Sequence, residues 1–109
     1  MDVTKIDTAL ERFGAKTDAF TQIVYKDLNK YAKEMEAAFE ENNAESLHIA
    51  AHSSKSIYSL IEADDALEIV KLIEQSSYNG DIAACKSLYK RLHPLYIRVN
   101  DHLKKRLGE

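Results

Sequence analysis

The scarcity of helix-breaking residues is the strongest constraint on the fold of this chain. Its 109 residues include only three glycines and one proline, so few points are available at which a helix must end. Ala, Leu, Glu and Lys are abundant, and no segment sustains the apolar–polar alternation of a strand. We therefore expect an all-α protein, and the length of residues 1–109 suits a single domain with one core.

Apolar residues at steps of three and four predict five helices. Their expected ranges are residues 4–13, 17–41, 44–61, 65–78 and 82–103. Gly14 and Gly80 suit helix ends, and Asn43 and Asp81 suit N-caps. Asp65 with Glu68 three residues later resembles a capping box.

Pro94 lies within the last of these helices, where proline removes one backbone hydrogen bond. We expect a kink or a short break near His93. Short loops between the four longer helices predict an antiparallel four-helix bundle, with the additional short N-terminal helix packed across one end.

Charge and hydropathy exclude several classes of function. The net charge is −3 and the one short basic run, KKR at residues 104–106, suits a helix C-terminus, so no nucleic-acid partner is expected. No apolar run approaches the roughly 20 residues of a membrane span, and the N-terminus lacks the regions of a signal peptide. Cys85 is the single cysteine, which excludes an internal disulfide framework and suits a small core residue. We expect a cytoplasmic protein without membrane contact.

The segment IAAHSSKSIYSL, at residues 49–60, combines a core stripe with an unusual second stripe. One helical face carries Leu47, Ala50, Ser54, Ile57 and Ile61. A different stripe carries a histidine, His52, and a lysine one turn later, Lys55, among small residues. The small neighbours Ser53, Ser56 and Ser59 cannot cover either side chain.

Helices 44–61 and 65–78 are expected to form an antiparallel hairpin that turns near Ala63. Residues equally distant from the turn then lie at the same height. His52 lies 11 residues before Ala63 and Glu74 lies 11 after it, while Lys55 and Lys71 lie 8 residues on either side. The sequence therefore predicts Glu74 beside His52, with two lysines flanking them.

This set of residues suits nucleophilic catalysis by histidine. A carboxylate that accepts a hydrogen bond from Nδ1–H fixes the tautomer in which Nε2 is a free nucleophile. The ammonium of Lys55 lies on the same helical face and could meet the oxygens of a phosphoryl group on Nε2. We therefore predict His52 as a phosphoacceptor that forms a phosphoramidate, with Glu74 orienting the imidazole.

These residues resemble the histidine-containing phosphotransfer (HPt) domain family of two-component phosphorelays. The family motif A-H-x-L-K-G reads AHSSKS at residues 51–56, and the pair Ile73–Glu74 stands where the family often has L-E. The segments IDTALERFG and EADDALEIVKLIEQSSYNGD extend the resemblance over nearly the whole chain. Ser54 and Ser56 replace the leucine and glycine of the motif, and Glu62 replaces a glycine often found before the Ala63 position.

The resemblance implies a phosphorelay intermediate rather than an enzyme with its own ATP site; no Gly-rich phosphate loop is present. His52 would exchange a phosphoryl group with the aspartate of a response-regulator receiver domain, and a hybrid sensor histidine kinase is a second expected partner. The receiver would supply Mg²⁺, and this chain would bind no cofactor. We expect a monomer whose docking surface includes His48, Ser53, Ser56, Ser59 and Lys71.

Two alternatives remain open at this stage. The first is a non-catalytic adaptor or structural bundle that binds a receiver without phosphotransfer. The second is a zinc site built on His48 and His52, with Glu45 or Glu74 added, although no HExxH or CxxC pattern is present. The remaining histidines, His93 and His102, are expected to be surface residues.

Overall fold

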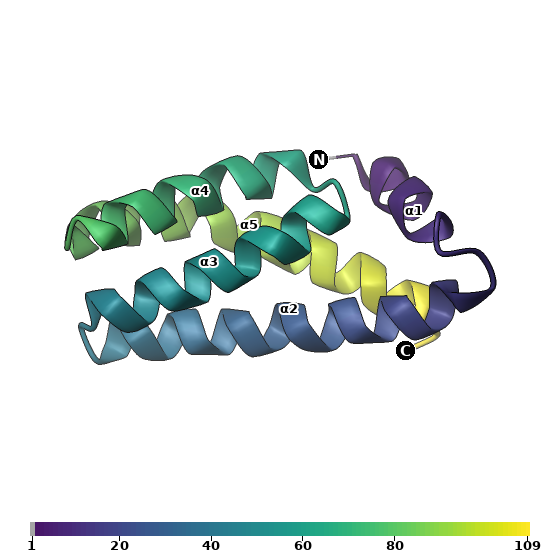
Figure 1. The fold of residues 1–109 in the computed structure, drawn as a ribbon, viewed down its shortest axis with the longest axis horizontal. Helices are drawn as coiled ribbons and strands as arrows, with labels where there is room; N and C mark the ends of the chain where they lie inside the picture. The colour runs from purple at the N-terminus through teal and green to yellow at the C-terminus, as the bar shows by residue number, and fades with distance from the viewer. Residues whose placement is uncertain (1) are drawn as a thin grey trace.

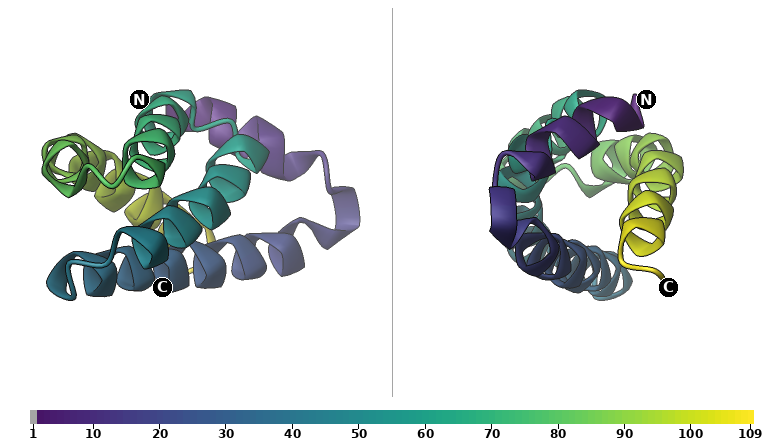
Figure 2. Two further views of the ribbon diagram at one scale, coloured as in Figure 1. Left: turned by 60° about the vertical axis from the view of Figure 1, so that its left-hand side comes forward. Right: turned by 90° about the vertical axis from the view of Figure 1, so that its right-hand side faces the viewer.

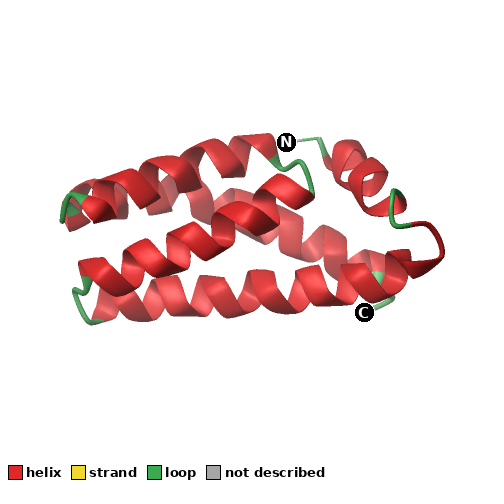
Figure 3. Ribbon diagram, viewed as in Figure 1, coloured by secondary structure: helices red, strands yellow, loops and turns green. Residues whose placement is uncertain are grey.

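The computed structural model describes residues 2–109 and consists of helices joined by short turns (Figures 1 and 3). No strand occurs in this described part of the chain, which confirms the all-α prediction. The elements are α1 (Val3–Glu11), the 3₁₀ turn η1 (Gly14–Lys16), α2 (Thr17–Glu40), α3 (Ala44–Leu60), α4 (Asp64–Tyr78) and α5 (Ile82–Arg106).

The long helices pack against one another along a shared core. Helix α2 packs against α3 and α5, and α4 packs against α3 and α5, as the end-on view in Figure 2 illustrates. The core is mainly aliphatic, and its fully buried members come from every α-helix. They include Ile6 and Leu10 of α1, Val24 of α2, Leu47 of α3, Val70 of α4 and Val99 of α5.

Two of the predicted N-caps are confirmed. The Asn43 side chain accepts from the backbone N–H of Ser46 at 3.0 Å, and the Asp81 side chain accepts from that of Ala84 at 3.0 Å. The predicted capping box at Asp65 is wrong. Helix α4 begins one residue earlier, with Ala63 at the N-cap and no side-chain cap; Asp65 therefore lies in the first turn, where its charge suits the helix dipole.

The predicted break near Pro94 does not occur, because α5 runs without interruption from Ile82 to Arg106; the alternative expectation of a kink there stays a prediction. Pro94 is exposed, so its ring faces away from the packed side of the helix. Not every apolar residue of α2 is buried: Ile23 is 53% exposed, whereas its neighbour Val24 lies in the core at 1% exposure.

The turn between α3 and α4 fixes how the two helices face each other. Glu62 adopts a left-handed backbone conformation with φ of 53°, which costs a residue with a side chain about 1 kcal/mol or more relative to glycine. The flanking residues Ile61 and Ala63 are buried at 0% and 1% exposure. Their burial holds the turn, so the hairpin reverses where the sequence predicted it.

Helix α1 lies across the end of the molecule that contains this turn (Figure 1). Lys5 forms an ion pair with Asp64, and Arg12 pairs with Glu62 at 3.0 Å between Nη1 and Oε2. These contacts add to the burial of Ile6 and Leu10. Helix α1 is therefore held against the turn between α3 and α4.

Candidate functional site

Helix α3 divides the segment around His52 into a buried and an exposed face. The five predicted core positions, from Leu47 to Ile61, are all at most 8% exposed. Ser54 is among them, and its hydroxyl donates to the carbonyl oxygen of Ala50 at 2.8 Å. A buried hydroxyl therefore has a partner within its own helix. The His52 side chain lies on the opposite face and is 67% exposed.

Glu74 of α4 connects the two predicted site residues of α3. Its Oε2 lies 2.5 Å from Nδ1 of His52, and its Oε1 accepts from Nζ of Lys55 at 2.9 Å. The predicted proximity of His52 and Glu74 is confirmed. A carboxylate can only accept, so the proton of a neutral His52 ring must be on Nδ1 and the lone pair on Nε2.

The environment of Glu74 favours its charged form. The hydrogen bond from Lys55 lowers the pKa of this carboxyl; partial burial acts in the opposite direction, and the hydrogen bond from His52 adds to the lowering. The net pKa lies below the ordinary value. With 17% of its side chain exposed, Glu74 is more enclosed than His52 or Lys55. Its two hydrogen-bond partners nevertheless keep it as a carboxylate.

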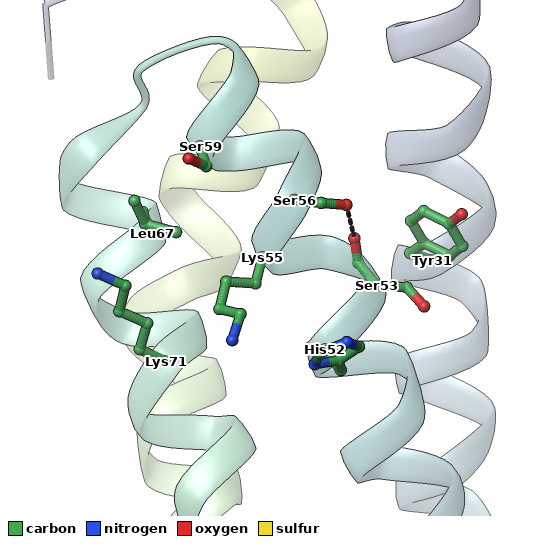
Figure 4. Close-up of a pocket in the computed structure, with 8 residues that line it drawn as sticks. All are labelled: Tyr31, His52, Ser53, Lys55, Ser56, Ser59, Leu67 and Lys71. Atoms are coloured by element: carbon green, nitrogen blue, oxygen red, sulfur yellow. Dashed lines mark hydrogen bonds between the residues drawn. The ribbon is translucent and has the colours of Figure 1, made fainter.

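His52 opens onto a groove of about 520 Å³ between α2, α3 and α4 (Figure 4). Most predicted docking residues line it: Ser53, Ser56, Ser59 and Lys71, together with Lys55. The Ser56 hydroxyl donates to the carbonyl of Ser53 at 2.8 Å. The groove therefore combines a histidine, two lysines and small polar side chains on one open surface.

Lys71 and His48 are placed differently from the other predicted docking residues. Lys71 lines the groove, but its Nζ lies 3.6 Å from Oε1 of Glu68 in an exposed pair. His48 does not line the groove. Its Nδ1 lies 3.0 Å from the backbone carbonyl oxygen of Glu74, so it is part of the contact between α3 and α4.

The zinc alternative finds no support in the geometry. Among residues 2–109, no three His, Cys, Asp or Glu side chains gather in a way that could hold a metal ion. The ring nitrogens that His48 and His52 direct to α4 are hydrogen-bonded to different parts of Glu74. Cys85 is fully buried, as predicted for a core residue.

The prediction missed two groove residues and misplaced one histidine. Tyr31 of α2 and Leu67 of α4 line the groove, and the α3–α4 hairpin heights gave no information about α2. His102, expected at the surface, has a side chain only 18% exposed and bonds through Nε2 to Oδ1 of Asp7 at 2.7 Å. The pair joins α5 to α1, and only the His93 prediction holds, since that residue is exposed.

Comparison with known proteins gives no family assignment. No family model matches the chain, and no curated protein or solved structure resembles it significantly. None of the helices formed by residues 2–109 has the length and apolar character needed to cross a membrane.

Proposed function

We propose that this protein is a phosphorelay intermediate that carries a phosphoryl group on Nε2 of His52. The observation that carries the proposal is the shared carboxylate of Glu74, which binds Nδ1 of His52 through one oxygen and Lys55 through the other. This arrangement leaves Nε2 as the free nucleophile on a side chain that is 67% exposed. The resemblance of AHSSKS to the HPt motif points to the same chemistry.

The proposed step is an exchange with an aspartyl phosphate of a receiver domain. The Nε2 lone pair attacks phosphorus; the N–P bond forms, the P–O bond to the aspartate breaks, and its electron pair leaves with the aspartate carboxylate. The proton on Nδ1 stays on the ring, which becomes cationic. The Glu74 carboxylate stabilises that charge, and the reverse sequence returns the phosphoryl group.

Lys55 supports the same step from the other side of Glu74. Its ammonium has three donors, and one of them is used at Glu74 Oε1. A second donor can meet a phosphoryl oxygen, because Lys55 lines the same groove as His52. Lys71 adds positive charge to this groove, which suits an acidic receiver site that brings its own Mg²⁺.

The proposal includes an antiparallel four-helix bundle of α2 to α5 with α1 as an added helix. The pairwise packing of α2 with α3 and α5, and of α4 with α3 and α5, supports this arrangement. The proposal further includes a cytoplasmic location, a monomeric state and the lack of an ATP site. Response-regulator receivers, and a hybrid sensor histidine kinase that carries one, are the proposed partners.

Phosphotransfer from a receiver tests the proposal directly. The protein is incubated with several receivers phosphorylated on aspartate, and acid-labile, base-stable label is measured on wild type and His52→Gln. We expect label on wild type and none on His52→Gln. The exposed His93 offers a control, because His93→Gln should label like wild type. Receiver binding without label would instead favour the adaptor, and label that persists in His52→Gln would contradict the assignment.

Lys55→Ala tests the role of the ammonium. Lys55 is partly exposed and contributes no core contact, so the variant should fold with the same helix content. Losing one charge-assisted hydrogen bond in the transition state should slow transfer by about 10-fold or more. The rate is measured by rapid quench with saturating phosphorylated receiver, and an unchanged rate would show that Lys55 has no part in transfer.

A further inference from the structure

A second histidine connects the two helices of the site one turn before His52. Nδ1 of His48 on α3 lies 3.0 Å from the backbone carbonyl oxygen of Glu74 on α4. A carbonyl can only accept, so Nδ1 of His48 carries a proton and donates. The side chain of Glu74 thus contacts His52, and the backbone carbonyl of Glu74 accepts a hydrogen bond from His48.

The His48 ring also contacts an aromatic side chain of α4. It lies against the ring of Tyr78, one turn after Glu74, with centroids 5.7 Å apart and planes inclined by 53°. His48 is half-buried between the helices. The hydrogen bond to Glu74 and the contact with Tyr78, which is itself 79% exposed, both join α3 to α4 and favour one spacing between the helices.

That spacing decides whether the Glu74 carboxylate reaches both of its partners. Oε2 contacts His52 at 2.5 Å and Oε1 contacts Lys55 at 2.9 Å, and both partners are on α3. The Ser77 hydroxyl donates to the same carbonyl as His48, at 2.9 Å. Ser77 belongs to α4 itself, so its bond cannot set the distance to α3.

We propose that His48 is a positioning residue that holds the Glu74 backbone where its carboxylate keeps the proton of His52 on Nδ1. The bond needs only a hydrogen on Nδ1 of His48. Both the Nδ1–H tautomer of the neutral ring and the charged ring carry that hydrogen. The importance of His48 for phosphotransfer rests on the proposed function. The tautomer of His52 is a property of the protein alone.

Imidazole ¹⁵N spectra of the full chain test the proposal without any partner. The His52 signals are identified by their loss in His52→Gln. His48→Leu removes the donor, whereas His48→Asn keeps an amide nitrogen close to the position of Nδ1. We expect the Nδ1–H tautomer of His52 in wild type and His48→Asn, and a mixture with Nε2–H in His48→Leu. An unchanged tautomer in His48→Leu, or the same mixture in His48→Asn, would overturn the proposal.

Ser77→Ala is the matched control, because it removes the other donor to the same carbonyl while leaving the link between helices. It should keep the wild-type tautomer. If Ser77→Ala lost the Nδ1–H tautomer of His52 to the same extent as His48→Leu, the number of hydrogen bonds at the Glu74 carbonyl would matter rather than the contact with α3. The proposal would then fail. Circular dichroism establishes that each variant retains its helices.

Transfer from a phosphorylated receiver gives the second measurement. His48→Leu should slow transfer by about 10-fold through misplacement of the imidazole, and His48→Asn should restore most of the rate. An unchanged rate would overturn the role of His48 in transfer. Failure of wild type to accept a phosphoryl group would reject the proposed function, whereas the tautomer result would still decide what His48 does.

Discussion

At the scale of single residues, Glu74 determines the character of the site. Its side chain is hydrogen-bonded to both His52 and Lys55, and it is more enclosed than either. Its two oxygens have different partners. The bond to His52 therefore limits movement of the carboxylate toward Lys55, and the bond to Lys55 limits its movement toward His52. The imidazole of His52 and the ammonium of Lys55 are therefore both positioned by a third residue, Glu74.

Glu74→Gln should change how stability depends on pH. The native pKa of Glu74 is lowered, chiefly by Lys55, so its charge stabilises the fold above the ordinary pKa of a glutamate. This contribution is lost as pH falls through the lowered native pKa. The free energy of unfolding of wild type should exceed that of Glu74→Gln by about 1 kcal/mol at pH 7. This difference should vanish in acid.

Urea unfolding between pH 7 and pH 3 measures this difference. Glu68→Gln is the control, since Glu68 is 73% exposed and pairs with Lys71 at 3.6 Å. That exposed pair should contribute little at any pH. A pH profile of Glu74→Gln that matches wild type would show that the Glu74 carboxylate gains nothing from its charged partners.

At the scale of elements, the helices were more predictable than the contacts between them. Apolar spacing and caps placed the helix ends within two or three residues, because both signals are local. Equal distance from the Ala63 turn placed Glu74 beside His52. It could not place Tyr31 in the groove, since hairpin heights carry no information on where α2 lies. The hydrogen bond between Asp7 and His102 joins residues 95 positions apart, and no local sequence pattern predicts it.

Pro94→Ala should stabilise the protein. Helix α5 continues through Pro94 although the ring cannot donate a backbone hydrogen bond, and proline costs about 3 kcal/mol relative to alanine inside a helix. We expect a gain of about 1 to 3 kcal/mol in the free energy of unfolding, measured with urea. Pro94→Gly restores the N–H but adds backbone freedom, so it should gain about 1 kcal/mol less. A loss of stability in Pro94→Ala would mean that α5 requires the proline.

At the scale of the whole molecule, the candidate site lies on the outside of an elongated body. The molecule measures about 42 by 21 by 19 Å, with a radius of gyration of 13.8 Å. The buried residues of α3 face away from His52 and belong to the common core. A group added to Nε2 would meet the groove and solvent, so it requires no repacking of the core.

Phosphorylation of His52 should therefore leave the shape of the protein unchanged. Small-angle X-ray scattering should give the same radius of gyration before and after modification, and light scattering should give the 12.4 kDa of a monomer. Amide NMR shifts should change mainly around the groove on α3 and α4. A larger radius or a doubled mass would show that the modification acts on assembly or on the core.

If His52 carries a phosphoryl group as proposed, the exposure of its side chain bears on how long that group survives. A phosphoryl group on a side chain that is 67% exposed would face bulk water, so spontaneous hydrolysis would compete with delivery to a receiver. The fraction of phosphoryl groups that reach a receiver, rather than water, would then depend on how often the modified protein encounters a receiver. The cellular concentration of receivers, rather than the strength of any one contact, would set the fidelity of the relay.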